Sequence, residues 1–317
     1  MRKLSVILLV IVLVLGCFAV VAMAQKPLTI MNFNNISAQF GVHLGLGPTL
    51  MPFDEKRVLQ VTFLQEYAPD VVGLQEADPY YAQVNYLLNH LPDYSATLTD
   101  YELPILYRHD VLELKESYYI PFIPVAVARF AVKKTGQEFY LFNSHGGSST
   151  HNARRIVKEL SNFVQNASGP INIVWVGDFN ASKKDDFYKI LTTGEHPTFR
   201  DSWRELPVSA RKGLPADKEP GLEWILYAGA IKSVSTERVD YTINERHISD
   251  HPAVQADFVF EKVEKPQYEY GNLELSSMEV KTGENLEVKT TIKNLGGLGS
   301  PEIGLYVDGL LVDTKWL

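Results

Sequence analysis

The chain has 317 residues, of which 45% are hydrophobic, 21% charged and 11% aromatic. This length and composition supply a large apolar core, which excludes a disordered chain, a coiled coil and a small disulfide-stabilised protein. The 30 Lys and Arg residues stand against 38 Asp and Glu residues, a formal net charge of −8. That charge argues against a protein that holds nucleic acid simply through a basic surface, but it is compatible with metal-assisted chemistry on phosphates.

The N-terminus has the features of an export signal. Arg2 and Lys3 precede an apolar run over residues 4–24, which ends in the small-x-small tripeptide of a signal peptidase site. We therefore expect the chain to be secreted or to stay at the extracytoplasmic cell surface. Two alternatives remain: the run is long enough for an uncleaved membrane anchor, or Cys17 is the acylated residue of a lipoprotein. Cys17 is the only cysteine, so a chain cleaved after the run has no thiolate chemistry and no Cys-ligated zinc.

The patterning divides the remainder of the chain into two regions. From residue 27 to residue 261, short apolar strands alternate with amphipathic stretches, which predicts a layered α/β domain. Residues 262–270 are charged and irregular, as in a linker. Residues 271–317 alternate like strands and predict a small β-sandwich, truncated because it has about half the usual length. Its pattern resembles the opening half of immunoglobulin-like, cell-adhesion-related modules of exported prokaryotic proteins, which implies contact with a cell surface.

Apolar residues at helical spacing predict three helices within the first region. The first is indicated by Val58, Val61 and Leu64, which would form its inward face. The second and third cover residues 84–91 and 156–164. We expect these helices to pack against the faces of a β-sheet.

Four apolar strands end in polar groups that suit metal or phosphate chemistry. In layered α/β proteins such groups converge on one pocket, because loops at strand ends meet above a rigid sheet. One polar residue after a strand is usually only a turn residue, so only the ordered set of such residues indicates a site. The strands cover residues 28–34, 71–76, 139–145 and 173–180 and end on Asn34, Glu76, His145 and the pair Asp178 and Asn180, while Asp250 and His251 precede a strand over 253–260.

These motifs, in this order, resemble the endonuclease/exonuclease/phosphatase superfamily, which includes DNase-like nucleases, abasic-site endonucleases, inositol-phosphate phosphatases and bacterial sphingomyelinases. The resemblance covers residues 28–260 and is carried by PDVVGLQEA, VGDFNAS and ISDHPAV, with LPILYR and FNSHGG in support. It implies an α/β fold, a four-layer sandwich of two stacked β-sheets flanked by helices, with one metal-centred site.

The resemblance implies a metal site and a water-positioning pair. Glu76 is similar to the main Mg²⁺ ligand of the family, with Asn34 beside it and Asp250 in the same site. Mg²⁺ is held by one or two carboxylates and keeps several waters, and Mn²⁺ is the alternative metal. Asp178 and Asn180 match the acid and amide that position the attacking water or the scissile phosphate.

The resemblance also implies roles in catalysis and substrate binding. His145 matches the imidazole that contacts phosphoryl oxygens, and His251 matches the terminal histidine, which serves as a general base or phosphate ligand with its neighbouring acid. Such groups stabilise or relieve the charge that develops on a phosphoryl group. Tyr107, Arg108 and Asn143 are expected to contact the substrate phosphate, and a packed core position is the alternative for Tyr107.

One position departs from the family pattern. Family members usually carry an aspartate about 25 residues before the Ser-Asp-His motif, and it orients the catalytic histidine. Asp240 matches by local sequence but stands only ten residues before Asp250, whereas Glu223 stands 27 residues before it. We therefore predict that Glu223 supports His251, since one more methylene still allows a carboxylate to fix the imidazole tautomer.

These observations lead to several functional hypotheses. The first is an exported, Mg²⁺-dependent hydrolase of phosphate esters, a phosphodiesterase or nuclease acting on DNA or RNA. Arg154, Arg155 and Lys158 begin the basic stripe expected of a nonspecific nuclease, and a solvated helix face is the alternative. The alternatives are a sphingomyelinase-like phospholipid headgroup phosphodiesterase, for which the sequence shows no clear apolar hairpin, a phosphomonoesterase, and a catalytically degenerate surface scaffold. The sequence does not fix the oligomeric state.

Overall fold

The computed structural model describes residues 26–36, 53–77, 80–97, 102–120, 125–146, 150–165, 171–193, 197–243 and 246–261, with short strand segments from residue 268 onward. The export segment over residues 4–24 lies outside the described residues. Within these ranges, no helix combines the length and the apolar character that crossing a membrane requires.

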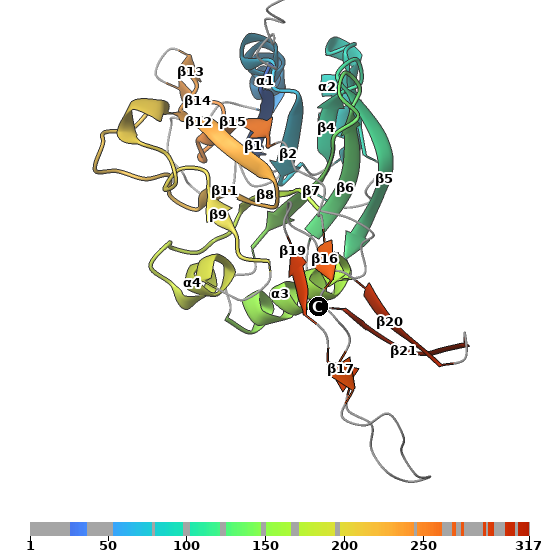
Figure 1. Cartoon of the computed structure of the whole chain (residues 1–317). Helices are drawn as coiled ribbons and strands as arrows, with labels where there is room; N and C mark the ends of the chain where they lie inside the picture. Colours follow the sequence, from blue (N-terminus) through green and yellow to red (C-terminus); the bar gives the residue numbers. More distant parts are fainter. Residues whose placement is uncertain are drawn as a thin grey trace, which may run out of the picture.

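Two β-sheets are stacked face to face, and helices cover their outer sides (Figure 1). This is the four-layer α/β sandwich that the resemblance predicts. The first sheet consists of β1 (Leu28–Asn34), β2 (Val71–Gln75), β3 (Tyr94–Ala96), β4 (Ile105–Arg108), β10 (Arg211–Lys212), β12 (Ile231–Val239) and β15 (Ala253–Phe260), in the order β10-β12-β15-β1-β2-β4-β3. The second consists of β5 (Leu112–Ile120), β6 (Val125–Val132), β7 (Glu138–His145), β8 (Ile173–Asp178), β9 (Arg200–Asp201) and β11 (Glu223–Ala228), in the order β5-β6-β7-β8-β11-β9.

Three apolar layers separate the four structural layers. The largest lies between the sheets and includes Ile30 and Val174. A second packs the other face of the first sheet against its two helices, and a third, centred on Trp175, does the same for the second sheet. The helices are α1 (Phe53–Tyr67) and α2 (Tyr80–His90) on the first sheet, α3 (Thr150–Gln165) and α4 (Asp186–Thr193) on the second, and a 3-10 turn over Val208–Ala210.

Helix α1 covers the predicted helix but turns a different face inward. Val61 and Leu64 are buried as expected, whereas Val58 is 49% exposed. Two polar residues, Lys56 and Gln60, take inward positions instead and are almost fully buried. The apolar pattern misassigned Val58 because the inward stripe of this helix begins with polar side chains that have buried hydrogen-bond partners.

Strand pairing brings the candidate residues to one edge of the sandwich. In the first sheet β1 and β2 are parallel, and Asn34 pairs in register with Gln75. In the second sheet β7 and β8 are also parallel, and His145 pairs with Asp178. Strand β11 runs antiparallel to β8 and sets Glu223 opposite Asp178. The carboxyl ends of four strands therefore meet where β11 begins.

The segments after β15 form small antiparallel pairs, β16 with β19, β17 with β18, and β20 with β21. The predicted linker over 262–270 contains β16 from residue 268, and its earlier residues lie outside the described ranges. These pairs do not establish an immunoglobulin-like sandwich, which stays a prediction. A further hairpin joins β13 (Thr242–Ile243) to β14 (Arg246–His247), and the late strands are β16 (Tyr268–Tyr270), β17 (Glu274–Leu275), β18 (Val288–Lys289), β19 (Ile292–Asn294), β20 (Glu302–Val307) and β21 (Leu310–Trp316).

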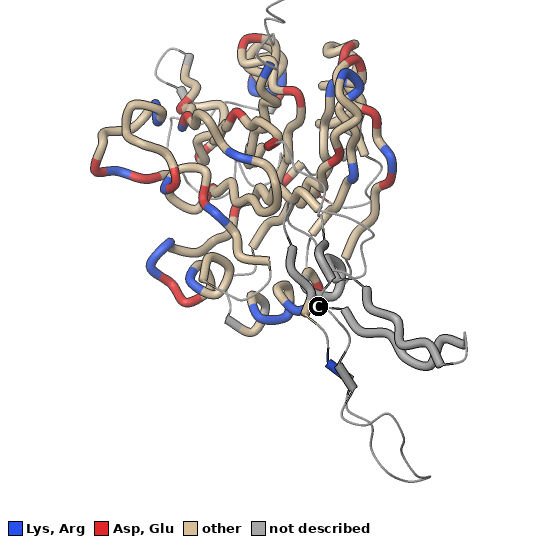
Figure 2. Tube along the Cα trace, viewed as in Figure 1, with Lys and Arg blue, Asp and Glu red and all other residues tan. Residues whose placement is uncertain are grey.

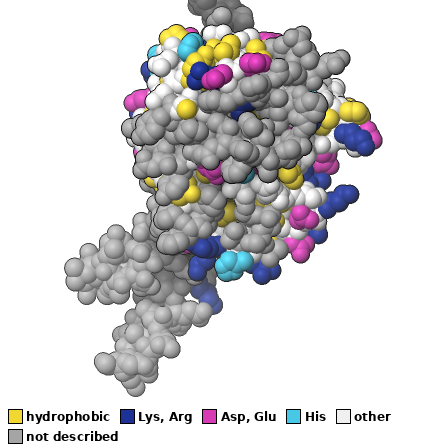
Figure 3. All heavy atoms as spheres, turned by 180° about the vertical axis from the view of Figure 1, so that it is seen from behind, with side chains coloured by type: hydrophobic (Ala, Val, Ile, Leu, Met, Phe, Trp, Pro, Cys, Tyr) yellow, Lys and Arg dark blue, Asp and Glu magenta, His cyan; other side chains and the backbone are white. Residues whose placement is uncertain are grey.

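Charges of both signs are interspersed over the described part of the chain (Figure 2). The basic positions of α3 form a blue segment next to the mark of the C-terminus in that view. From the opposite side, Lys and Arg again lie beside Asp and Glu on the described surface (Figure 3). Because both signs of charge are mixed on the described surface, any strong local electrostatic field must come from a particular cluster of side chains.

Candidate active site

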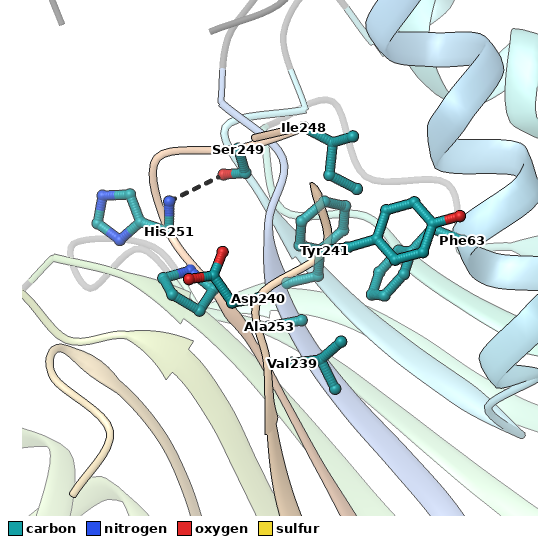
Figure 4. Close-up of a pocket in the computed structure, with 10 residues that line it drawn as sticks. Phe63, Val239, Asp240, Tyr241, Ile248, Ser249, His251 and Ala253 are labelled. Atoms are coloured by element: carbon teal, nitrogen blue, oxygen red, sulfur yellow. Dashed lines mark hydrogen bonds between the residues drawn. The ribbon is translucent and has the colours of Figure 1, made fainter. Parts of the chain in front are cut away.

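A small pocket lies where the turn before β15 meets the end of β1 (Figure 4). One wall is aromatic, with the ring centroids of Phe63 and Tyr241 5.2 Å apart. His251 points away from these rings, and its backbone N–H donates to Ser249 Oγ over 3.1 Å. The Ser249 hydroxyl donates to the carbonyl of Asn34 over 2.7 Å. Ser249 thus fixes the turn that carries His251 to the end of β1.

Asn34 links two carboxylates that come from different sheets. Its Nδ2 donates to Glu76 Oε1 and to Asp178 Oδ2, each over 3.0 Å. Its Oδ1 accepts the backbone N–H of Ile36 over 2.9 Å, which fixes the orientation of the amide. In this arrangement the Asn34 amide orients two acidic side chains, and its place in the metal group stays a prediction.

Two of the site residues have a left-handed backbone. Glu76 follows β2 with φ of 53°, and Asn180 follows β8 with φ of 46°. For residues other than glycine this conformation is uncommon and costs energy, so surrounding contacts must hold it. The backbone N–H of Asn180 donates to Asp178 Oδ1 over 3.0 Å, which turns the chain sharply after the strand and leaves Asn180 exposed at the site.

His145 lies between the two carboxylates and a third acid. Its Nε2 is 3.5 Å from Glu76 Oε1 and 3.9 Å from Asp178 Oδ2. Its Nδ1 is 3.0 Å from Glu102 Oε1. The hydrogen bond to Glu102 is the main reason that the pKa of His145 rises above its ordinary value, against the effect of burial. His145 therefore has its own acidic partner.

Glu102 is a site residue that sequence reasoning missed. Its carbonyl accepts the backbone N–H of Ala77 over 3.1 Å, which places it beside Glu76. Strand β4 runs antiparallel to β2, so residues just before β4 lie beside residues just after β2. The available signal was the position of Glu102 immediately before the strand in LPILYR.

His251 is supported by Glu223. Its Nδ1 forms a hydrogen bond with Glu223 Oε1 and lies 3.5 Å from Asp178 Oδ2, while its Nε2 is 3.8 Å from Asp250 Oδ2. Burial alone lowers the pKa of His251, but the hydrogen bond and charge of Glu223, with the other two acids, raise it to about 9. Asp240, the rival candidate, binds His247 Nδ1 over 2.7 Å instead.

Asp250 lies at the rim of the site. Burial raises its pKa above the ordinary value, and the charge of Glu76 acts in the same direction, while His251 and Lys56 oppose both. Lys56 is itself buried on α1, and burial lowers its pKa to about 7, against the attraction of Asp250 and Glu76. Sequence reasoning missed this amine because the apolar periodicity of the helix placed Val58, and not Lys56, on its inward face.

Asn143 does not reach the site surface. It is fully buried between the sheets, where its Nδ2 donates to the carbonyl of Leu74 over 2.7 Å and its Oδ1 accepts from Gln75 Nε2 over 2.6 Å. The sheets approach closely here, since a Cβ added to Gly73 would lie 2.3 Å from Val176 Cγ2. A substrate contact by Asn143 does not fit this placement, and its amide instead joins the two sheets beneath the site.

Tyr107 and Arg108 lie at the far end of β4 from the site. Tyr107 pairs in register with Val71, the first residue of β2, whereas the site lies after the last. Its ring packs against Phe130 in the core between the sheets, with centroids 5.0 Å apart. Arg108 donates to Asp110 over 2.7 Å. The antiparallel direction of β4 thus contradicts the expected substrate contacts and supports the core alternative for Tyr107.

The side chains present fit a divalent cation. Glu76, His145 and Asp178 each offer a ligand atom, and the three atoms lie within 4.8 Å of one another; Asp178, Glu223 and His251 form a second such group. The two carboxylates of the first group suit Mg²⁺ or Mn²⁺, whereas an imidazole is a commoner ligand of softer metals. Asp250, predicted as a ligand, is in neither group of the described residues. The hydrogen bond between Glu223 and His251 favours the first group for the cation.

Comparison with known proteins agrees with this arrangement. The model of the Endonuclease/Exonuclease/phosphatase family matches residues 49–251. Among curated proteins, none matches the chain significantly.

Solved structures share the fold. The chain is similar to an endonuclease/exonuclease/phosphatase from Bacteroides vulgatus, with 20% identity and a TM-score of 0.60 over 75% of this chain and 100% of that one. It is also similar to mannosyl-6-phosphatase of Bacteroides thetaiotaomicron, with 16% identity and a TM-score of 0.59 over 74% of this chain and 100% of that one. A third similar structure is TDP2 of D. rerio complexed with a single-strand DNA product, with 21% identity and a TM-score of 0.55 over 74% of this chain and 99% of that one. At these identities the likeness establishes the fold.

Proposed function

Because the chain belongs to the endonuclease/exonuclease/phosphatase family, a family of metal-dependent phosphoric ester hydrolases, we propose that it is an exported, Mg²⁺-dependent phosphodiesterase that cleaves nucleic acid. The observation that best supports a catalytic role is that Asp178 lies between the imidazoles of His145 and His251. Each imidazole also has a second carboxylate partner, Glu102 for His145 and Glu223 for His251. A structural ion pair needs no such duplication, whereas hydrolysis of a phosphate ester uses both a proton acceptor and cationic donors.

The residues divide the chemistry between them. Glu76 and Asp178 would hold the cation, which would supply Lewis-acid stabilisation of the phosphoryl oxygens, while the raised pKa of His145 suits it to contact those oxygens as a donor. Asp178 is 1% exposed and oriented by the amide of Asn34, so its carboxylate is placed to accept a proton from the attacking water.

His251 is held as an imidazolium. Glu223 binds its Nδ1 and raises its pKa to about 9, so at neutral pH the Nε2–H is available as a donor. We assign it to a nonbridging phosphoryl oxygen, where positive charge is most effective as negative charge develops. His145, held at Nδ1 by Glu102, presents Nε2 to the same space.

A phosphomonoester is the second candidate substrate. Mannosyl-6-phosphatase and TDP2 complexed with DNA are similar to this chain to a comparable degree. The roles proposed for the described site residues concern the phosphate and not the group attached to it, so they fit a phosphomonoester as well as a phosphodiester. Contact with a cell surface through residues 271–317 and export through residues 4–24 remain our predictions.

The test is hydrolysis by the chain purified from residue 25 onward. Plasmid DNA, RNA, sphingomyelin, mannose 6-phosphate and a chromogenic phosphodiester are each incubated with Mg²⁺, with Mn²⁺ or with EDTA. We expect metal-dependent cleavage of DNA or RNA that is lost in Glu76→Gln, while the exposed-lysine control Lys189→Met behaves as wild type. Cleavage of the sugar phosphate alone would replace the nuclease with a phosphatase, and cleavage of none would contradict the function.

A further inference from the structure

A buried polar network lies beneath the candidate site, between α1, α2 and the ends of β1 and β2. It consists of Lys56, Gln60, Asn35 and Gln83, none of which is more than 4% exposed. None of these side chains belongs to the metal-binding group or to the imidazole pairs. Buried amides and amines destabilise a fold unless hydrogen bonds satisfy them, so their partners show what the network holds.

The network begins at the turn that follows Asn34. Lys56 Nζ donates to the carbonyl of Asn35 over 2.8 Å and to that of Ile36 over 2.7 Å. Ile36 has a left-handed backbone, with φ of 51°. The same residue donates its N–H to Asn34 Oδ1. Lys56 therefore fastens the strained turn that orients the Asn34 amide.

The network continues to the backbone of Glu76. Gln60 Nε2 donates to Asn35 Oδ1, and Asn35 Nδ2 donates to Gln83 Oε1. Gln83 Nε2 in turn reaches the carbonyl of Glu76 over 3.5 Å. The left-handed residues that follow β1 and β2, Ile36 and Glu76, are thus connected through side chains of two helices.

We propose that Lys56 is a positioning residue, which holds the turn after β1 so that Asn34 keeps Glu76 and Asp178 at the separation a divalent cation requires. The inference rests on the proposed function of this site as a metal-dependent hydrolase. Groups that orient metal ligands without touching the metal typically contribute about 10- to 100-fold in affinity or activity.

The direction of the effect distinguishes positioning from simple charge. In its protonated form Lys56 lies near Glu76 and Asp250 and repels a cation, so if it acted only through that charge, its removal would tighten metal binding. If Lys56 acts by holding the turn, its removal weakens metal binding although a positive charge is lost. The two roles therefore predict opposite signs.

The experiment measures Mn²⁺ binding to the full chain by electron paramagnetic resonance, without substrate. We expect Lys56→Met to bind Mn²⁺ about 10- to 100-fold more weakly than wild type. Lys56→Arg, which keeps the donors, recovers most of the affinity, and Gln83→Leu, which cuts the connection to Glu76, weakens binding by a smaller factor. Lys189→Met, a matched change of an exposed helical lysine on α4, keeps the wild-type affinity.

A second readout uses the metal-free protein. The backbone N–H groups of Asn35 and Ile36 donate to Gln75 O and Asn34 Oδ1, and we expect their hydrogen exchange to accelerate in Lys56→Met while that of strand β8 is unchanged. Faster exchange confined to these two residues distinguishes loss of positioning from global unfolding. If Lys56→Met does not fold, Gln83→Leu and Lys56→Arg are compared with the wild type in its place.

The outcomes separate the inference from the proposed function. Unchanged or tighter Mn²⁺ binding in folded Lys56→Met, or unchanged exchange at Ile36, overturns the positioning role. A wild-type chain that binds Mn²⁺ but cleaves no phosphate ester overturns the proposed function and leaves the positioning result standing. A wild-type chain that binds no Mn²⁺ overturns both.

Discussion

Glu223 and Asp178 are direct register partners across the antiparallel pair of β11 and β8. This pairing sets two carboxylates side by side, and both face Nδ1 of His251. The arrangement explains why glutamate serves at this position. It is the first residue of β11, so its longer side chain extends from the strand end to the imidazole.

Replacement of Glu223 by Gln tests this support directly. The amide keeps the shape but removes the charge, so we expect the pKa of His251 to fall from about 9. The rate should fall by about a hundred- to a thousandfold, the usual range for loss of a donor that stabilises developing negative charge. Heteronuclear NMR titration in EDTA measures the pKa, and a discontinuous assay measures kcat. Asp240→Asn is the matched control, and an equal loss in that variant would return the orienting role to Asp240.

The interaction between Glu223 and His251 also makes the free energy of unfolding depend on pH. The folded-state pKa of His251, about 9, exceeds the ordinary value of 6.5. A raised histidine pKa stabilises the folded state fully below the unfolded value, and this contribution is lost as pH rises through the folded value. The difference in free energy of unfolding between wild type and Glu223→Gln should thus be largest near pH 6 and small near pH 10. Denaturant unfolding in EDTA measures it, and a difference that grows with pH would contradict the assignment.

Glu102 should act on His145 in a milder way. Glu102→Gln removes the charge that raises the pKa of His145 but leaves an amide oxygen as acceptor at Nδ1. We expect the His145 pKa to fall and kcat to drop by about 10- to 100-fold, as for other groups that orient a site residue. The readout is kcat together with the His145 titration, and the exposed acid Glu113 provides the control Glu113→Gln. If the pKa of His145 in Glu102→Gln equals that in the wild type, Glu102 does not have this role.

Asn143 is expected to affect stability. Asn143→Leu removes the donor to the buried carbonyl of Leu74 and one acceptor of the Gln75 amide, which keeps its bond to Asn32 Oδ1. A buried group left unsatisfied costs about 1–3 kcal/mol, so the free energy of unfolding should fall by at least that much. Urea denaturation gives this value, and a folded variant with wild-type stability but a raised KM would restore the substrate contact.

The strand ends were predictable because each lies in a continuous apolar run followed by a polar group. Asn34, Glu76, His145 and Asp178 follow this pattern, and parallel pairing of neighbouring strands places them together. Spacing along the chain also favoured Glu223, which the structure places against His251.

The remaining site residues depend on pairing direction and burial, which the sequence does not express. Glu102 precedes its strand, and only the antiparallel course of β4 brings it beside Glu76, while the same course carries Tyr107 away. Lys56 is polar on an inward face, so apolar periodicity assigned that face to Val58 instead. The buried carbonyls that Lys56 satisfies exist only in the folded turn.

The most direct test of the account is cleavage of plasmid DNA and RNA by wild type, Glu76→Gln and His251→Ala, with Mg²⁺ or with EDTA. We predict cleavage by wild type with Mg²⁺ only, and a loss of at least a hundredfold in both variants, each of which stays folded. Equal cleavage by wild type and His251→Ala, or undiminished cleavage in EDTA, would contradict a metal-dependent site built on Glu76 and His251.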